Sequence, residues 1–161
     1  MRQAHPVAWS DSPAGASGRS AINPSASQID VNLAYEPKRK GLFWYRTYKT
    51  EFEANYVIPN PTPIAQTVYV SFTLPCIATV QGGFVSNAAL GDNIIVYVID
   101  DENFDRFEND QSISTFYNSG KVKSGTFDVT LSEGEYYIVM SNTYSSFSTK
   151  TVQFQAASIC M

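Results

Sequence analysis

Residues 64–74, which read IAQTVYVSFTL, alternate apolar and polar side chains with a period of two. This alternation is typical of a half-buried β-strand, with Val68, Val70, Phe72 and Leu74 on the apolar side. Residues 28–35 repeat the pattern and are expected to form a second half-buried strand, whose apolar positions are Ile29, Val31, Leu33 and Tyr35.

Other segments predict further strands at short, nearly regular spacing. Residues 42–58 are rich in strand-forming side chains and exceed the usual strand of about 5–6 residues, so a bulge or bend is expected there. Pro61 and Pro63 predict a turn that would pair residues 42–58 with residues 64–74 as an antiparallel hairpin. The remaining strands are expected over residues 77–80, 84–85, 93–99, 113–117, 125–131, 135–141 and 149–159.

Two features of this pattern decide the fold class. Residues 93–99 are apolar on both faces, which predicts a central strand, and no run of ten or more residues shows a helical period. Many short strands with turns between them predict an all-β fold, an antiparallel β-sandwich of jelly-roll type with an extended N-terminal arm.

The first 27 residues differ from the rest in composition. They form a leader of Ser, Ala, Gly and Pro, followed by one sandwich domain over residues 28–161, divided into 28–75 and 76–161. Such a leader buries too little surface to fold alone. If it is ordered, its backbone is expected to be extended, with Trp9 and Ile22 in grooves formed by aromatics such as Trp44 or Tyr48, on this chain or an identical one.

The overall charge excludes some partners. The 161 residues carry a formal net charge of −4, so a general nucleic-acid binder, which usually has a basic face, is not expected. No apolar run approaches the roughly 18 residues that span a bilayer. The N-terminus has no apolar signal-peptide segment, and the compartment stays open.

Cys76 and Cys160 are the two cysteines of the chain. They border strand-like runs, so they would form a disulfide if those strands are neighbours; otherwise they are two separate buried thiols. The sequence leaves both readings open.

Three motifs in the second half follow one another at short intervals: Gly134-Glu135-Tyr136, then SNTYS over residues 141–145, then KTVQF over residues 150–154. This order resembles the C-terminal strands of the GOLD domain, and Gly82-Gly83 and residues 95–100 are similar to its earlier part. The resemblance covers residues 76–154 and implies a β-sandwich that acts as a non-catalytic interaction module. Val139 stands where membrane-anchored members carry a disulfide cysteine.

Catalytic constellations are sparse. The single histidine, His5, lies in the leader, so neither a Ser-His-Asp triad nor a histidine zinc site is expected inside the domain. Gly82-Gly83 lacks the lysine of a phosphate loop. We therefore expect no enzyme activity and no cofactor other than a calcium ion.

Calcium is suggested by the acidic stretch of residues 100–110. Asp100, Asp101, Asp105 and Asp110 offer the hard oxygen ligands that this ion requires, although their spacing does not match an EF-hand. The alternative is a solvated loop or a short helical turn that follows the central strand.

Aromatic residues suggest a partner-binding surface. Trp44, Arg46 and Tyr48 would share one face of a strand, with Trp9 as a further anchor in the leader. The leading hypothesis is a non-enzymatic binding module for a protein, glycan or lipid partner. The alternative is a structural subunit of a larger particle, fibre or surface layer, in which the leader contacts neighbours and a second copy covers the aromatic face.

Overall fold

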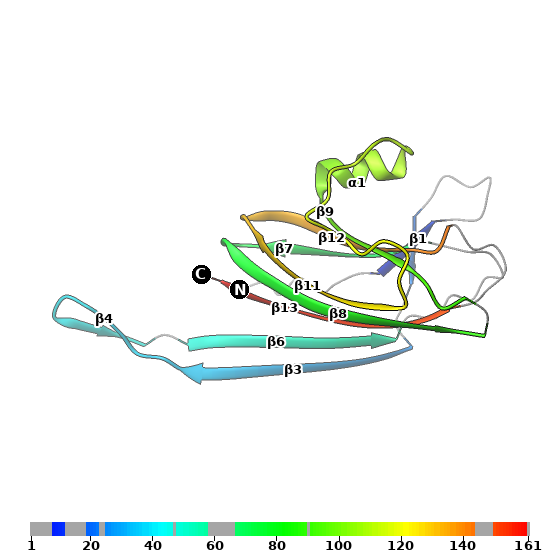
Figure 1. The fold of residues 1–161 in the computed structure, drawn as a ribbon. Coiled ribbons are helices and arrows are strands. Elements are labelled where there is room, and N and C mark those ends of the chain that lie inside the picture. The colour runs from blue at the N-terminus through cyan, green and yellow to red at the C-terminus, as the bar shows by residue number, and fades with distance from the viewer. Residues whose placement is uncertain are drawn as a thin grey trace.

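The protein is described from a computed structural model, which covers residues 8–11, 19–22, 25–46, 48–57, 67–89, 91–143 and 150–160. Only the backbone is described for residues 8–11, 19–22, 27, 45 and 48–57. Two antiparallel sheets lie face to face, a helix covers the outer face of one sheet, and a small hairpin projects from the other (Figure 1). The predicted all-β antiparallel sandwich is confirmed.

The first sheet contains six strands in the order β10-β9-β12-β7-β1-β2. Their bounds are β1 Ala8–Asp11, β2 Arg19–Ile22, β7 Val68–Leu74, β9 Ile95–Asp100, β10 Tyr117–Asn118 and β12 Gly134–Ser141. The expected strand over residues 113–117 is therefore reduced to the short β10, which pairs with Tyr97 and Val98 in the middle of β9.

The second sheet contains five strands in the order β11-β8-β13-β6-β3. Their bounds are β3 Ala26–Tyr35, β6 Tyr48–Val57, β8 Ala78–Ala88, β11 Ser124–Leu131 and β13 Lys150–Cys160. The chain segment that connects β3 to β6 forms a separate two-stranded sheet, made of β4 Lys38–Lys40 and β5 Phe43–Tyr45.

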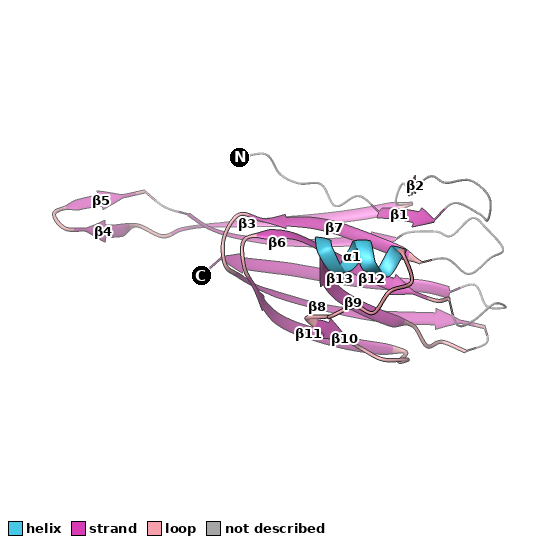
Figure 2. Ribbon diagram, turned by 90° about the horizontal axis from the view of Figure 1, so that it is seen from above, coloured by secondary structure: helices cyan, strands magenta, loops and turns pink. Residues whose placement is uncertain are grey.

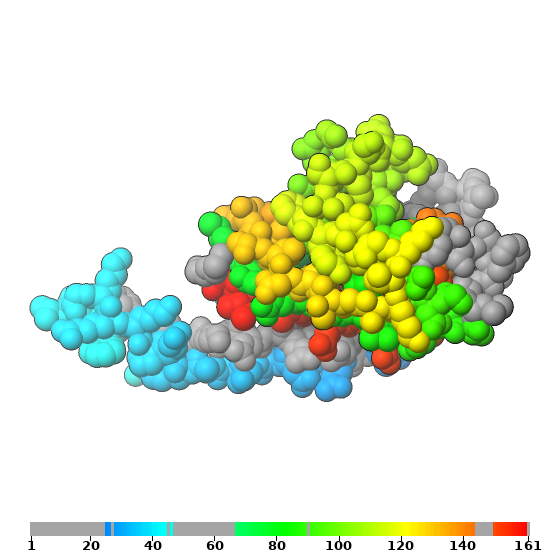
Figure 3. Space-filling view, in the orientation of Figure 1, coloured from blue at the N-terminus to red at the C-terminus, as the bar shows by residue number. Residues whose placement is uncertain are grey.

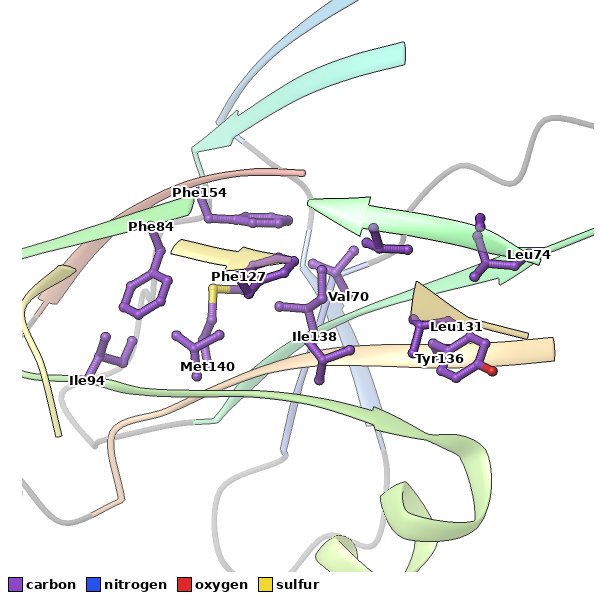
Figure 4. Packing of buried hydrophobic residues seen from close by; sticks show 14 residues of the cluster. Val70, Leu74, Phe84, Ile94, Phe127, Leu131, Tyr136, Ile138, Met140 and Phe154 are labelled. Atoms are coloured by element: carbon purple, nitrogen blue, oxygen red, sulfur yellow. The ribbon is translucent and has the colours of Figure 1, made fainter. Parts of the chain in front are cut away.

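The main core lies between the two sheets (Figure 4). Every second side chain of β7, β9 and β12 packs against every second side chain of β8, β11 and β13. The apolar positions that alternate in the sequence therefore form one core between the sheets. Members of this cluster include Val70, Val98, Ile138, Phe84, Phe127 and Phe154.

A second, smaller core lies on the opposite face of the six-stranded sheet. Helix α1, Asp101–Glu108, packs against β9 and β12 (Figure 2) and places Phe104 in a stack on the Tyr137 ring, with ring centroids 4.0 Å apart. Ile99 and Val139 are fully buried beneath it. Strand β9 is thus covered on both faces, as its two-sided apolar sequence predicted, and the acidic stretch begins as a helix.

Cys76 and Cys160 form a disulfide, with their Cα atoms 5.9 Å apart. Cys76 precedes β8, and Cys160 at the end of β13 pairs with Ala78 of β8, so the antiparallel ladder brings the two cysteines together. Of the two readings that the sequence left open, a disulfide or two separate thiols, the structure contains the disulfide.

The expected hairpin between residues 42–58 and residues 64–74 is wrong. The first segment divides into β5 and β6, as its excess length suggested, but β6 pairs with β3 and β13 whereas β7 pairs with β1 and β12. Strands β6 and β7 therefore lie in opposite sheets. A Pro-rich turn predicts a change of direction, but it does not choose between a hairpin and a crossing to the other layer.

Gly82 lies inside β8, which runs without interruption through both glycines where two short runs were expected. Gly82 pairs with Phe127, and a β-carbon built at Gly82 would overlap the Phe127 ring. The missing side chain makes room for an aromatic ring of the core, a use of glycine in strands where another group approaches closely.

The N-terminal leader contributes β1 and β2 to the edge of the six-stranded sheet. The backbone of Trp9 pairs with Tyr69 of β7 and with Ala21 of β2, not with β5 or β6. The side chains of Trp9, Ile22 and Tyr48 lie outside the described residues, so the predicted grooves are not described, and the domain boundary at residue 28 stays a prediction. Among the described residues, no helix is both long and apolar enough to cross a membrane.

Candidate functional site

Two of the four acidic residues proposed for calcium, Asp100 and Asp101, have structural partners in or beside α1. The Asp100 carboxylate caps the helix, accepting hydrogen bonds from the backbone N–H of Asn103 at 2.9 Å and from its side-chain Nδ2 at 2.8 Å. The Asn103 side-chain oxygen in turn accepts a hydrogen bond from the Ser114 N–H at 2.7 Å. Asp100 therefore begins the helix and helps to fix the loop that follows it.

Asp101 accepts a hydrogen bond from the Tyr137 hydroxyl at 2.9 Å. Burial, together with the Asp101 and Glu135 carboxylates, raises the pKa of Tyr137 above its ordinary value. This contact joins α1 to β12 and keeps the phenol in its neutral, donating form.

The four proposed ligands do not form a recognisable ion site. In the part of the chain that the structure describes, no group of three or more His, Cys, Asp or Glu side chains could hold a metal ion. Asp105 and Asp110 are exposed, and Asp110 lies just beyond the helix with a φ of 53°. The structure lends the calcium hypothesis no support, and the hypothesis stays an untested prediction.

A second polar cluster lies at the turn between β8 and β9. The Asp92 carboxylate accepts hydrogen bonds from Lys123 Nζ at 2.8 Å and from the Ala88 N–H at 2.9 Å, and these lower the pKa of Asp92. Lys150 Nζ donates to the Asn93 carbonyl oxygen, and burial lowers the pKa of Lys150. These hydrogen bonds join β8, β9, β11 and β13 at this end of the sandwich. The charged groups of the cluster therefore have a structural role.

The most exposed apolar side chains gather in the hairpin of β4 and β5, which we call the tip hairpin (residues 38–46). Leu42, Phe43 and Trp44 are 85%, 71% and 67% exposed. Figure 3 shows this segment, in cyan, standing away from the sandwich body. Consecutive large apolar side chains at such exposure lack the packing that holds the body together.

The turn of the tip hairpin depends on a glycine and on a side chain-to-backbone hydrogen bond. Gly41 has a φ of +64°, a conformation that favours glycine, and the Arg39 Nε donates to the Gly41 carbonyl oxygen at 2.9 Å. The register pairs Arg39 with Trp44 and Lys40 with Phe43. Because paired residues share a face, Trp44 lies on one side of the hairpin and Phe43 on the other.

The tip hairpin is also basic. Lys38, Arg39, Lys40 and Arg46 are all exposed, and residues 38–46 contain no acid, although the chain as a whole has an excess of acids. Of the predicted partner-binding residues, Trp44 and Arg46 thus lie on this exposed segment. The side chains of Trp9 and Tyr48 are outside the described residues.

Residues missed as candidates lie on β3, which forms as a strand as expected but is not half-buried. Its apolar side chains form a row, defined as Ile29, Val31, Leu33 and Tyr35, that is 44%, 49%, 64% and 57% exposed. The β13–β6 pairing ends at Ala54, whereas β3 and β6 stay paired as far as Tyr35 and Tyr48. The outer part of β3 therefore continues as a two-stranded ribbon toward the tip hairpin.

Comparison with known proteins does not assign this chain to a family. No family model matches the sequence, and no curated protein matches it. A solved structure described as "CBM4 structure and function" aligns over 83% of this chain and 84% of its own, with 14% identity and a TM-score of 0.34. The GOLD resemblance is supported by no family model and stays a prediction.

Proposed function

We propose that this chain is a non-enzymatic binding module that docks onto an anionic lipid surface with its tip hairpin. The observation that carries the proposal is the pair Phe43 and Trp44, which lie on opposite faces of β5 and are 71% and 67% exposed. A pocket in a protein partner receives one face of a strand. A lipid interface surrounds an inserted tip and covers both faces.

The charges of the tip hairpin favour the same partner. Lysine is depleted at protein–protein interfaces, whereas a Lys or Arg near an anionic membrane contributes about 1 kcal/mol. Lys38 and Lys40 lie on the face of Phe43, and Arg39 lies on the face of Trp44, so each face combines an aromatic ring with a base. Tryptophan, the residue at position 44, is enriched at the membrane–water interface.

Apolar insertion and basic charge are needed together. A single acyl chain holds a protein on a membrane only marginally, and stable anchoring takes a second signal such as a polybasic patch. Leu42, Phe43 and Trp44 supply the apolar part, and the four exposed bases of residues 38–46 supply the electrostatic part. The proposal contains no catalytic step, in keeping with a sequence whose single histidine is His5.

Co-sedimentation with vesicles tests the proposal. The chain is expected to sediment with vesicles of equal parts phosphatidylserine and phosphatidylcholine, and much less with phosphatidylcholine alone. The double variant Phe43→Ser/Trp44→Ser should lower the partition coefficient about a hundredfold or more, because each inserted apolar side chain contributes roughly 1.5–3 kcal/mol. The matched control Ile77→Ser/Val85→Ser removes exposed apolar side chains from the body and should leave sedimentation unchanged.

Two charge-reversal variants complete the test. Lys38→Glu/Lys40→Glu should abolish the preference for phosphatidylserine, whereas Lys121→Glu on the body should not. Absence of wild-type sedimentation, or equal sedimentation of the tip and control variants, would overturn the proposal and leave a protein or glycan as the partner.

A further inference from the structure

Strand β3 forms an open edge of the five-stranded sheet. It is paired with β6 along its whole length, from Ala26 with Val57 to Tyr35 with Tyr48, and no described strand pairs with its other side. An open edge presents unpaired N–H and C=O groups that another chain can bind.

This edge lacks the features that usually prevent such pairing. Lysine, proline and bulges commonly block edge strands. The ten residues of β3 contain no lysine and no proline, and Asp30 is their single charge. The register with β6 advances one residue at a time without a bulge.

The other edge of the same sheet provides a comparison. Among the described strands, β11 pairs with β8 alone, but its apolar residues Phe127 and Leu131 are buried, and its outward residues are the polar Ser124, Thr126, Asp128 and Thr130. On β3 the apolar row remains 44–64% exposed, and among the described strands it has a neighbour on one flank only. Both are edge strands, but the apolar side chains of β11 named here are buried, whereas those of β3 are exposed.

We propose that β3 pairs antiparallel with β3 of a second copy of this chain, about a two-fold axis at Asn32. A two-fold axis normal to the sheet pairs residues of the same face, so apolar side chains meet apolar side chains. With the axis at Asn32, Val31 faces the second copy's Leu33, and Ile29 faces its Tyr35.

The same register avoids charge repulsion. Asp30 faces Ala34 of the second copy, so the one charge on the strand does not meet itself. The apolar row, which is centred on Asn32, then overlaps completely with its counterpart, and each member gains a neighbour on its open flank. Cross-strand pairs of apolar residues stabilise antiparallel pairing.

The dimer has a geometric consequence. Strand β3 runs from the sandwich body toward the tip hairpin (Figure 1), so antiparallel pairing places the two tip hairpins at opposite ends of the dimer. The pairing does not depend on what the tip binds.

Sedimentation velocity of the full chain tests the association. The wild type is expected to form a concentration-dependent dimer, and Leu33→Lys should shift it to monomer by placing a cation in the apolar row. The matched control Val85→Lys, at an exposed apolar position of β8, should remain dimeric. Circular dichroism of both variants verifies that they fold.

Cysteine cross-linking tests the register independently. Because both natural cysteines are bridged, a cysteine introduced into β3 is the one free thiol of the variant. Asn32→Cys should oxidise rapidly to a covalent dimer, since residues opposite one another in antiparallel strands have Cα atoms about 4.5–5.5 Å apart, within disulfide range. Asp30→Cys alone should not, but mixed with Ala34→Cys it should form a heterodimer.

Three results would overturn this proposal: a monomer at the highest soluble concentration, a dimer unaffected by Leu33→Lys, or equal cross-linking of Asn32→Cys and Asp30→Cys. None of them bears on vesicle binding, so failure here is distinguishable from failure of the tip hairpin as a lipid-docking element.

Discussion

The sandwich body and the segment from β3 to the tip hairpin use the same kinds of side chain with opposite results. In the body, Phe104 of helix α1 and Ile99 of β9, on which that helix packs, are 1% and 0% exposed. In the projecting segment, Leu33 and Phe43 are 64% and 71% exposed. Apolar alternation therefore shows which face of a strand is apolar, but not whether the same chain covers that face.

The difference implies two separate roles. Buried apolar area stabilises the fold at about 25 cal/mol per Å2, so the body accounts for most of the stability. Apolar side chains that remain exposed contribute little to folding and mark contact surfaces. Stability and binding should consequently respond to substitutions in different parts of the molecule.

The sharpest test of this division applies one substitution to both regions. Phe104→Ala removes a ring stacked on Tyr137 and should lower the free energy of unfolding by about 3–5 kcal/mol. Phe43→Ala removes a ring of the same kind from the tip hairpin and should change it by no more than about 0.5 kcal/mol. Chemical denaturation followed by circular dichroism measures both. Equal losses of unfolding free energy in the two variants would contradict the division, because they would mean that the Phe43 ring is packed as tightly as the Phe104 ring.

A smaller effect is expected at two adjacent glycines of β8. A β-carbon at Gly82 would overlap the Phe127 ring and lie 2.7 Å from the Gln155 carbonyl oxygen, whereas at Gly83 the nearest atoms are 3.6 Å away. Gly82→Ala should cost about 1–3 kcal/mol, and Gly83→Ala should be within about 0.5 kcal/mol of the wild type.

The matched melting curves of the two glycine variants decide this prediction. If Gly83→Ala is the more destabilising substitution, the assignment of Gly82 to the core-facing side of β8 is wrong.

Much of the body could be predicted from the sequence because its signals are local. Alternation predicted a strand over residues 64–74, of which 68–74 form β7, and the two-sided apolar run of residues 93–99 predicted the covered strand β9. The antiparallel sandwich follows from the number and spacing of such strands.

The errors concern pairing over long distances and coverage. The segments that became β6 and β7 lie on either side of a Pro-rich stretch, and nothing in their own sequence indicates that they belong to different sheets. The row on β3 has the pattern of a half-buried strand, but its missing cover cannot be deduced from the strand itself. Helix α1 is eight residues long, too short for a clear period, and Asp100, which was read as an ion ligand, is its cap.

Fluorescence of Trp44 gives the most direct test of the central claim, that the exposed apolar tip is a docking element. The chain has two tryptophans, so Trp9→Phe leaves Trp44 as the single reporter. In buffer its emission should be that of a water-exposed indole, and iodide should quench it. Phosphatidylserine-containing vesicles should shift the emission to shorter wavelength and protect it from iodide, while phosphatidylcholine vesicles should not. Emission that is already blue-shifted in buffer, or that stays unchanged with both kinds of vesicle, would contradict the account.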